Sequence, residues 1–405
     1  MKKFLALVLA LVMALSLVAC GQEAAPADEG AEGGEEVAAE YKVAMITDYG
    51  DITDQSFNQT TYEACKAFGE DNGIEFTYYK PAGDSDAERS AMIEKAVDDG
   101  FNVIVMPGYA FAAAIVASAP QFPDVKFIAL DVALGDLLAA AVGADYDYNP
   151  DNWTLSDYVD LSNVYCAVYQ EELCGYMAGY AAVKLGYKNL GFLGGMAVPA
   201  VMRYGYGFVQ GADAAAAELG LTDVKCNYVY GGQFFGDADI TAVMDTWYDG
   251  GTECVFASGG GIYTSAVEAA KKVDGKVIGV DVDQAGVIAN YAGVDGMTVT
   301  SAMKGLYPTT YDTLTDVCIN GNWDKYAGQI ATLGLVSGTD VDANYVGIPS
   351  GEGTQFADGQ FTLDDYAALV AAMFDGSLSV SNDISKTAAD MATVVAVDDQ
   401  GAIKG

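Results

Sequence analysis

The sequence contains no histidine and only two arginines, Arg89 and Arg203, among its 405 residues. Histidine is the commonest acid–base group and metal ligand in proteins, so its absence excludes a Ser-His-Asp or Cys-His hydrolase. The 19 lysines and arginines are outnumbered by 57 aspartates and glutamates, which gives a formal net charge of −38. Because binding to a phosphate backbone requires clusters of basic residues, nucleic acids are poor candidates as partners.

Paired cysteine spacing of the CxxC kind is also absent, although the chain has seven cysteines. Without that spacing a zinc or redox site has no support, and we expect neither a metal nor another cofactor. Cys166, Cys226 and Cys254 lie in apolar runs, where cysteine behaves as a small buried hydrophobe. We therefore expect the cysteines after Cys20 to be free, buried thiols.

The N-terminus has the pattern of an exported lipoprotein. Two lysines precede a short apolar stretch over residues 4–18, which is too short to span a membrane comfortably and predicts a signal peptide over residues 1–19. The sequence LVACG around Cys20 resembles a bacterial lipobox, in which the cysteine is acylated and becomes the first mature residue. Residues 20–40 hold almost no large apolar side chain, which predicts an acidic linker. Because acylation of Cys20 would anchor this linker in lipid, we expect the protein on the extracytoplasmic face of the cell membrane.

From residue 41 to the C-terminus, short apolar runs alternate with helical stretches. Continuous apolar strands separated by helices predict an α/β fold of parallel sheets covered on both faces. The runs are too numerous for one sheet of ordinary size, so we expect two similar lobes. The predicted first lobe spans residues 41–163, with roughly 298–325 returning to it, and the second spans 164–297, with roughly 326–405 returning.

An acidic stretch over residues 134–162 fits this alternation poorly. Its aspartates and asparagine at alternate positions from Asp145 to Asp151 resemble the start of a calcium-binding loop. Pro150 stands where such a loop needs glycine, and Ser156 stands where it needs glutamate. We therefore expect a solvated acidic loop.

The carboxyl ends of the predicted strands carry glycines and carboxylates. Ligands of open parallel sheets bind beyond these ends, so the residues there predict one crevice between two lobes. The most informative segment, residues 46–64, places Asp48, Phe57 and Asn58 at a strand-to-helix junction. Phe57 could stack on a flat ring and Asn58 offers a donor and an acceptor, whereas Asp54 or Ser56 could simply cap the helix.

Seven segments, taken together, resemble a known family over nearly the whole mature chain. That family is the basic-membrane-protein or PnrA-like lipoproteins, purine-nucleoside-binding components of ABC transporters. The matching segments are residues 47–59, 122–131, 171–182, 191–211, 278–284, 300–304 and 346–349. The resemblance implies a fold like that of type I periplasmic binding proteins, with the ligand in the cleft between the lobes.

The resemblance also implies a role for individual residues. The base would stack between Phe57 and Tyr204, the second of which is usually phenylalanine in the family. The edge of the base would face Asn58 and Asp131, with Asp48 close by. The implied ribose contacts are Gly259, Gly260, Asp281 and Lys304.

The expected function is therefore that of a monomeric transport receptor, not an enzyme. It would capture guanosine, inosine or adenosine outside the cell and deliver it to a membrane permease. One alternative keeps the fold but binds a sugar or a small signalling molecule. Another is a hydrolase that uses paired carboxylates, although Asp281 and Asp283 would point in opposite directions on an extended strand.

Overall fold

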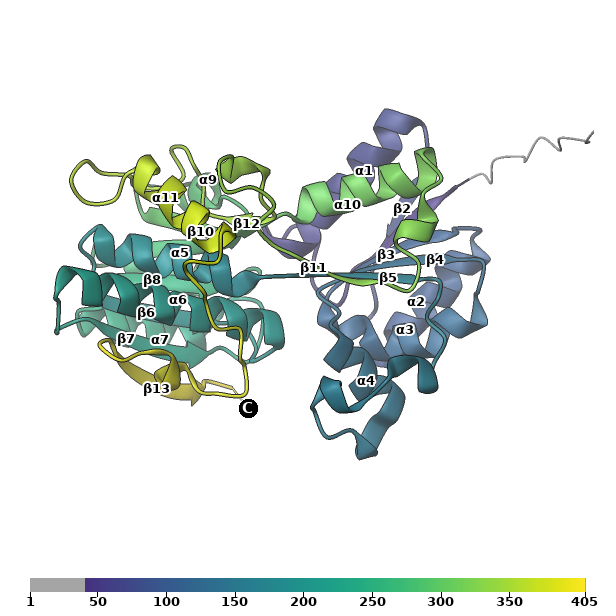
Figure 1. Cartoon of the computed structure of the whole chain (residues 1–405), viewed down its shortest axis with the longest axis horizontal. Helices are drawn as coiled ribbons and strands as arrows, with labels where there is room; N and C mark the ends of the chain where they lie inside the picture. Colours follow the sequence, from purple (N-terminus) through teal and green to yellow (C-terminus); the bar gives the residue numbers. More distant parts are fainter. Residues whose placement is uncertain (1–40, 405) are drawn as a thin grey trace, which may run out of the picture. The chain divides into compact units, whose positions relative to one another are not determined.

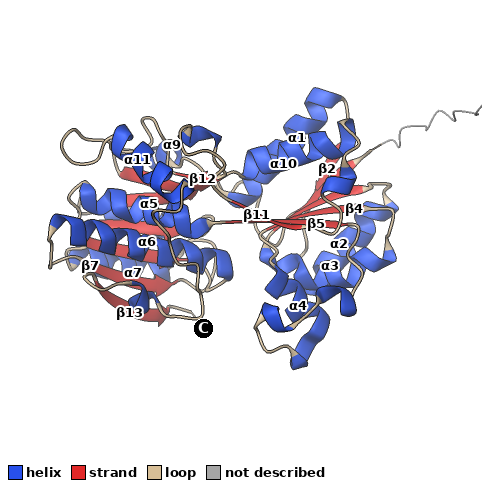
Figure 2. Cartoon of the chain, in the orientation of Figure 1, coloured by secondary structure: helices blue, strands red, loops and turns tan. Residues whose placement is uncertain are grey.

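A computed structural model describes residues 41–404, whose strands form two sheets with helices packed against them (Figure 1, Figure 2). The predicted signal peptide, the Cys20 anchor and the linker over 20–40 lie outside the described residues. Within residues 41–404, no helix combines the length and the apolar character needed to span a membrane.

The first sheet has six parallel strands in the order β11-β5-β4-β3-β1-β2. The strands are β1 (Val43–Ile46), β2 (Phe76–Tyr79), β3 (Val103–Pro107), β4 (Lys126–Leu130), β5 (Val164–Tyr169) and β11 (Ile330–Leu333). Helices α1 and α10 lie on one face, and α2, α3 and α4 lie on the other (Figure 1). These helices are α1 (Phe57–Asn72), α2 (Asp86–Asp98), α3 (Ala112–Ser118), α4 (Leu134–Val142) and α10 (Leu306–Leu314).

The second sheet has seven strands in the order β12-β10-β9-β8-β6-β7-β13, and only β12 runs antiparallel to its neighbour. The strands are β6 (Asn189–Gly194), β7 (Lys225–Tyr230), β8 (Cys254–Ser258), β9 (Lys276–Asp281), β10 (Thr298–Lys304), β12 (Val346–Gly347) and β13 (Ala396–Ala402). The helices of this half are α5 (Glu171–Lys184), α6 (Pro199–Leu219), α7 (Ala238–Asp249), α8 (Tyr263–Ala270), α9 (Ala285–Ala292) and α11 (Leu363–Phe374). The apolar side chains of α5, α6 and α11 belong to a core cluster that also includes residues of the first sheet, whereas those of α7, α8 and α9 form a second cluster.

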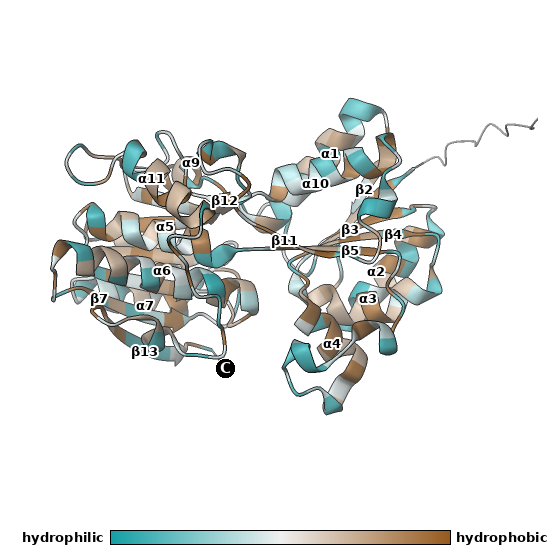
Figure 3. Ribbon diagram, viewed as in Figure 1, coloured by the Kyte–Doolittle hydropathy of each residue, from teal (hydrophilic) through white to brown (hydrophobic). Residues whose placement is uncertain are grey.

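The central strands are buried along their whole length. Every residue of β1, β3 and β8 is buried, and hydrophobic residues concentrate on the strands and the helix faces that turn toward them (Figure 3). Strands covered on both faces must be apolar at every position, which explains why their sequences show no alternation. The predicted α/β fold with parallel sheets flanked by helices is confirmed.

The lobe boundaries expected from the sequence differ from these sheets. β5 lies in the first sheet instead of opening the second lobe, β10 lies in the second sheet, and β11 returns to the first. A buried strand is equally apolar in either sheet, so its sequence does not reveal which one it joins. The chain therefore crosses between the sheets after β5, after β10 and after β11.

Backbone hydrogen bonds join the three crossing segments to one another. Gln170 N donates to Leu333 O at 2.9 Å, and Gly305 N donates to Tyr345 O at 2.7 Å. Tyr345 N in turn donates to Gly334 O at 3.0 Å. The crossings therefore form one bonded connection, and they place the first residue of α5 and the last residue of β10 between the sheets.

The acidic stretch over 134–162 consists of α4 followed by short 3₁₀ turns. Asp147 accepts hydrogen bonds from Asn152 Nδ2 and Trp153 Nε1, each at 2.7 Å, and from Asn149 N at 3.0 Å. The Asp147 carboxylate therefore accepts its hydrogen bonds from donors within the same loop.

The six cysteines of the described chain are unpaired thiols. Five are buried as expected, whereas Cys318, in the π-helical turn over residues 315–319, is only half-buried.

Glycines allow α5 and α6 to touch through their backbones. A Cβ atom on Gly179 would lie 2.0 Å from Phe208 O, and one on Gly211 would lie 2.0 Å from Tyr176 O. Carbon and oxygen atoms cannot approach so closely, so these positions accept only glycine unless the helices separate. This contact fixes Glu171, on α5, beside the first turns of α6.

Replacing Gly179 with alanine should destabilise the protein, because the added methyl group must push the two helices apart. Overpacking of this kind costs about 2–3 kcal/mol of unfolding free energy, measurable by urea denaturation. The control is Gly286→Ala on α9, where a Cβ atom meets nothing within 4 Å, and we expect unchanged or slightly higher stability. Equal midpoints for wild type and Gly179→Ala would contradict the close packing.

Candidate ligand-binding site

A cavity of about 340 Å³ lies at the carboxyl ends of strands from both sheets. Its walls come from the last residues of β9 and β10, from the segments after β1, β2, β3, β4, β6, β7 and β8, and from the first turns of α1, α4 and α6. All nine ligand-binding residues predicted from the sequence line this one cavity: Asp48, Phe57, Asn58, Asp131, Tyr204, Gly259, Gly260, Asp281 and Lys304.

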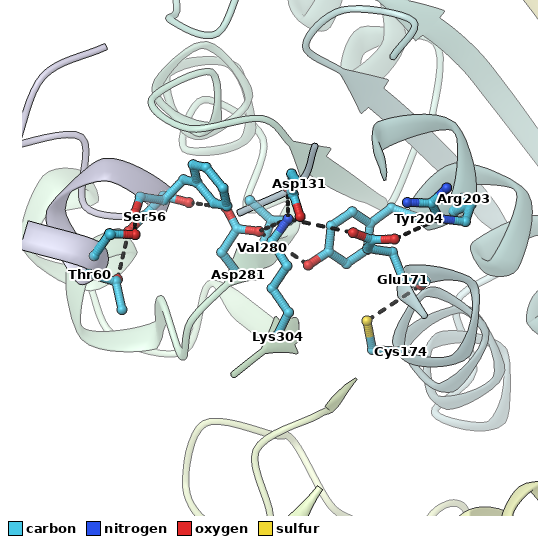
Figure 4. A network of polar contacts seen from close by, with 12 residues as sticks. Ser56, Thr60, Asp131, Glu171, Cys174, Arg203, Tyr204, Val280, Asp281 and Lys304 are labelled. Carbon is cyan, nitrogen blue, oxygen red and sulfur yellow. Dashed lines mark hydrogen bonds and ion pairs between the residues drawn. The ribbon is translucent and has the colours of Figure 1, made fainter. Parts of the chain in front are cut away.

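Lys304 is the ion-pairing centre of the cavity. It is the last residue of β10 and its side chain is 3% exposed. Its Nζ lies 2.5 Å from Asp131 Oδ2, 3.6 Å from Asp281 Oδ1 and 3.7 Å from Glu171 Oε1 (Figure 4). The three carboxylates follow β4, end β9 and begin α5, so one ammonium group joins four elements of the fold.

A second cation extends this group of charges. Arg203, on α6, donates from Nε to Glu171 Oε2 at 2.7 Å and lies 3.9 Å from Glu172 Oε2. Glu171 is completely buried between the two cations. We call these six residues the buried charge cluster: Asp131, Glu171, Glu172, Arg203, Asp281 and Lys304. With four carboxylates and two cations, it is a site where negative charge exceeds positive charge.

Burial and neighbouring charges shift the pKa values of residues in the cluster. Burial raises the pKa of Asp131 to about 6, with Lys304 opposing the rise and Glu171 adding to it. Burial also raises the pKa of Glu172 to about 7. For Lys304, burial lowers the pKa, but Asp131, Asp281 and Glu171 together raise it above its ordinary value. Lys304 therefore stays charged at neutral pH.

Asp131 and Asp281 have unusual backbone conformations. Their φ angles are +60° and +66°, in the left-handed region that non-glycine residues rarely adopt. Both residues stand where a parallel strand ends, and in this conformation their carboxylates reach Lys304. Such strain persists only where surrounding interactions hold it, and it concentrates at functional sites.

Two aromatic rings of the cavity lie near the ammonium group. Lys304 Nζ is 4.6 Å from the ring centre of Phe57 and 5.6 Å from that of Tyr204. Phe57 is half-buried in the first turn of α1, whereas Tyr204 is 2% exposed and packs edge-on against Phe256. The Tyr204 hydroxyl donates to Asp281 Oδ1 at 3.1 Å, so this buried polar group has its partner.

The turn before α1 holds the other polar groups of the cavity. Asp48 Oδ1 accepts from the backbone N–H groups of Tyr49 and Gly50, both at 2.6 Å. Asn58 Nδ2 donates to Asp54 Oδ2 at 3.2 Å, while Asn58 Oδ1 is buried without a hydrogen-bond partner among the described residues. A buried acceptor of this kind is costly unless a donor reaches it, which suits a ligand with N–H groups.

The two candidate caps of α1 prove to have different roles. Asp54 accepts from the backbone N–H groups of Ser56, Asn58 and Gln59, and so caps the helix. Ser56 makes no side-chain cap bond; its Oγ donates to Asp281 Oδ2 at 2.5 Å instead. This bond links the turn before α1 to the end of β9.

Sequence reasoning missed Glu171 and left Arg203 without a role, although both belong to the buried charge cluster. Glu171 is an acidic residue in the first turn of a helix, where carboxylates are common because they complement the helix dipole. That ordinary placement gave no sign that the side chain is wholly buried between two cations. Three aromatic residues that line the cavity were also not singled out: Tyr49, Phe234 and Phe235.

The fold is shared with solved solute-binding proteins of ABC transporter systems. A protein from Aeropyrum pernix K1 superposes with a TM-score of 0.61 at 19% identity, covering 87% of this chain and 90% of its own. One from Conexibacter woesei gives a TM-score of 0.59 at 21% identity, covering 84% and 99%. At these identities the likeness establishes the fold alone.

Sequence comparison identifies relatives that match about three quarters of this chain. The ABC transporter nucleoside-binding protein BmpA of Lactococcus lactis subsp. cremoris is 25% identical over 75% of this chain and 81% of its own length. Basic membrane protein B of Borreliella afzelii is 25% identical over 74% and 80%.

The family model described as ABC transporter substrate-binding protein PnrA-like matches residues 41–348, most of the chain. Together with the cavity at the strand ends of two parallel sheets, this match shows that the chain belongs to the PnrA-like family of ABC transporter substrate-binding proteins.

Proposed function

We propose that the protein captures purine nucleosides in the cavity and delivers them to a membrane permease. Substrate-binding proteins of this family bind small ligands for an ABC transporter and are transport components, not enzymes. The observation that carries the proposal is the pair of aromatic rings, Phe57 and Tyr204, lining one cavity with a carboxylate and an ammonium group. A flat base can stack on the two rings, and the cis-diol of a ribose can hydrogen-bond to Asp281 and Lys304. The name of the Lactococcus relative agrees with this choice.

The base and the ribose are assigned to different parts of the cavity. Asn58, Asp48 and Asp131 would take the edge of the base, since Asn58 Oδ1 and Asp131 Oδ1 are buried acceptors without a partner in the described chain. The ribose would lie beside Asp281 and Lys304. It would also lie against the turn at Gly259 and Gly260, whose φ angles of +155° and +51° let the backbone approach closely.

The charges around the cavity favour a nucleoside over a nucleotide. Six lining residues are carboxylates, and only three are cations. Each cation has a carboxylate partner: Lys80 lies 2.8 Å from Asp51, while Arg203 and Lys304 belong to the buried charge cluster. A phosphate would have to compete with these carboxylates, so an uncharged ligand is the better fit.

The transport role accounts for the predicted N-terminus. Acylation of Cys20 would hold a monomeric receptor at the outer face of the cell membrane, next to its permease. The linker over residues 20–40 would connect this anchor to the folded part of the chain.

Isothermal titration of the ligand-free protein tests the proposal. We expect guanosine, inosine or adenosine to bind, with uridine, free ribose, galactose and inosine monophosphate binding at least about tenfold more weakly. The purine offers more ring area to Phe57 and Tyr204, and stacking of one base is worth about 1–3 kcal/mol. Absence of binding by all three purine nucleosides would overturn the proposal, and tight binding of galactose would instead support a sugar receptor.

The same titration with Phe57→Ala should weaken purine binding by about tenfold or more, because one stacking surface is lost. The matched control is Phe374→Ala, since Phe374 is half exposed on α11 and does not line the cavity. Equal loss of affinity in both variants would mean that the effect does not come from stacking.

Binding should also weaken in mild acid. The pKa of Asp131 is raised to about 6, so its carboxylate is mostly ionised at pH 7.5 and mostly protonated at pH 5. The groups around it are Lys304, Glu171, Asp281 and Arg203, and protonation removes the negative charge that strengthens a hydrogen bond from the base. We expect inosine affinity to fall by about tenfold from pH 7.5 to pH 5. Asp131→Asn should bind weakly at both pH values, and an unchanged wild-type affinity would contradict the role of Asp131.

A further inference from the structure

Asp281 already receives two hydroxyl groups from the protein itself. Ser56 Oγ donates to Oδ2 at 2.5 Å, and the Tyr204 hydroxyl donates to Oδ1 at 3.1 Å (Figure 4). Lys304 Nζ adds a cation 3.6 Å from Oδ1. The Asp281 side chain is only 7% exposed, so these groups provide most of its surroundings. Both carboxylate oxygens therefore accept hydrogen bonds from the protein itself.

Each oxygen of the Asp281 carboxylate thus accepts a hydrogen bond from one protein hydroxyl. A carboxylate has two oxygens with about four acceptor positions, so Asp281 can still accept from a sugar. The sugar hydroxyl would add a bond to an acceptor that is already satisfied. Without the sugar hydroxyl, neither oxygen of Asp281 would be left buried without a donor.

This difference decides how strongly a site rejects an analogue that lacks a hydroxyl group. Strong rejection arises when the missing group leaves a buried polar atom of the protein without a partner. If the protein supplies its own partners, the analogue loses only the modest net contribution of one hydrogen bond.

We propose that the sugar end of the cavity tolerates loss of a ribose hydroxyl, so that 2′-deoxyribonucleosides are ligands as well as ribonucleosides. The Tyr204 hydroxyl is the group that sets this tolerance, with Ser56 as its partner on the other oxygen. The inference rests on the proposed function, because it takes Asp281 as the carboxylate that faces the sugar.

The test compares the dissociation constants of inosine and 2′-deoxyinosine by isothermal titration. For the wild-type protein we expect a ratio of about tenfold or less. In Tyr204→Phe the ring remains but Asp281 Oδ1 loses its hydroxyl donor, so the ratio should rise by a further factor of about ten. Ser56→Ala should raise the ratio in the same direction through Oδ2.

Tyr230→Phe is the matched control. The Tyr230 hydroxyl also forms a buried hydrogen bond, at 2.9 Å to Tyr228, but Tyr230 does not line the cavity. The ratio should therefore stay at the wild-type value in this variant.

The outcomes separate this inference from the proposed function. Tight inosine binding with strong rejection of 2′-deoxyinosine, unchanged in Tyr204→Phe, would overturn the inference and leave the nucleoside receptor in place. A low ratio in every variant would also overturn the role of Tyr204. Failure of the wild type to bind either nucleoside would overturn the proposed function and the inference with it.

Discussion

The ion pairs of Lys304 are the interaction on which the architecture of the cavity depends. Its ammonium group, at the end of β10, lies within 4 Å of carboxylates that follow β4, end β9 and begin α5. Two of these carboxylates stand on backbone held in the left-handed region. Removing one partner of a buried ion pair is strongly destabilising, because it leaves the other charges uncompensated. Lys304 therefore both neutralises carboxylates in the cavity and holds the elements that carry them together.

The fold brings these charges together through two structural features. The hydrogen-bonded crossings between the sheets position Lys304 and Glu171, and the glycine contact of α5 with α6 positions Arg203 and Tyr204. Stability and binding are thus linked, since a shift of α6 would move an ion-pair partner and an aromatic wall together. The same geometry lets the Tyr204 hydroxyl donate a hydrogen bond to Asp281, so one oxygen of this carboxylate has a protein donor.

Much of the architecture could be predicted from the sequence, because buried parallel strands are apolar along their length and strand-end residues must share one edge of a sheet. Asp48, Asp131 and Asp281 were predicted from their positions at strand ends, whereas Tyr204 and Lys304 were predicted only from the family resemblance. The sheet membership of β5, β10 and β11 could not be predicted, since it depends on long-range pairing that strand composition does not encode. Glu171 was missed because its burial follows from packing between α5, α6 and β10, whereas its sequence position is ordinary for a helix start.

The most direct test of this account is a crystal structure of the protein grown with inosine. We predict the hypoxanthine ring between Phe57 and Tyr204, with the ribose beside Asp281 and Lys304 and the Lys304–Asp131 ion pair retained. Inosine bound in the reverse orientation, or Lys304 displaced from the carboxylates by the ligand, would contradict the central role given to this lysine.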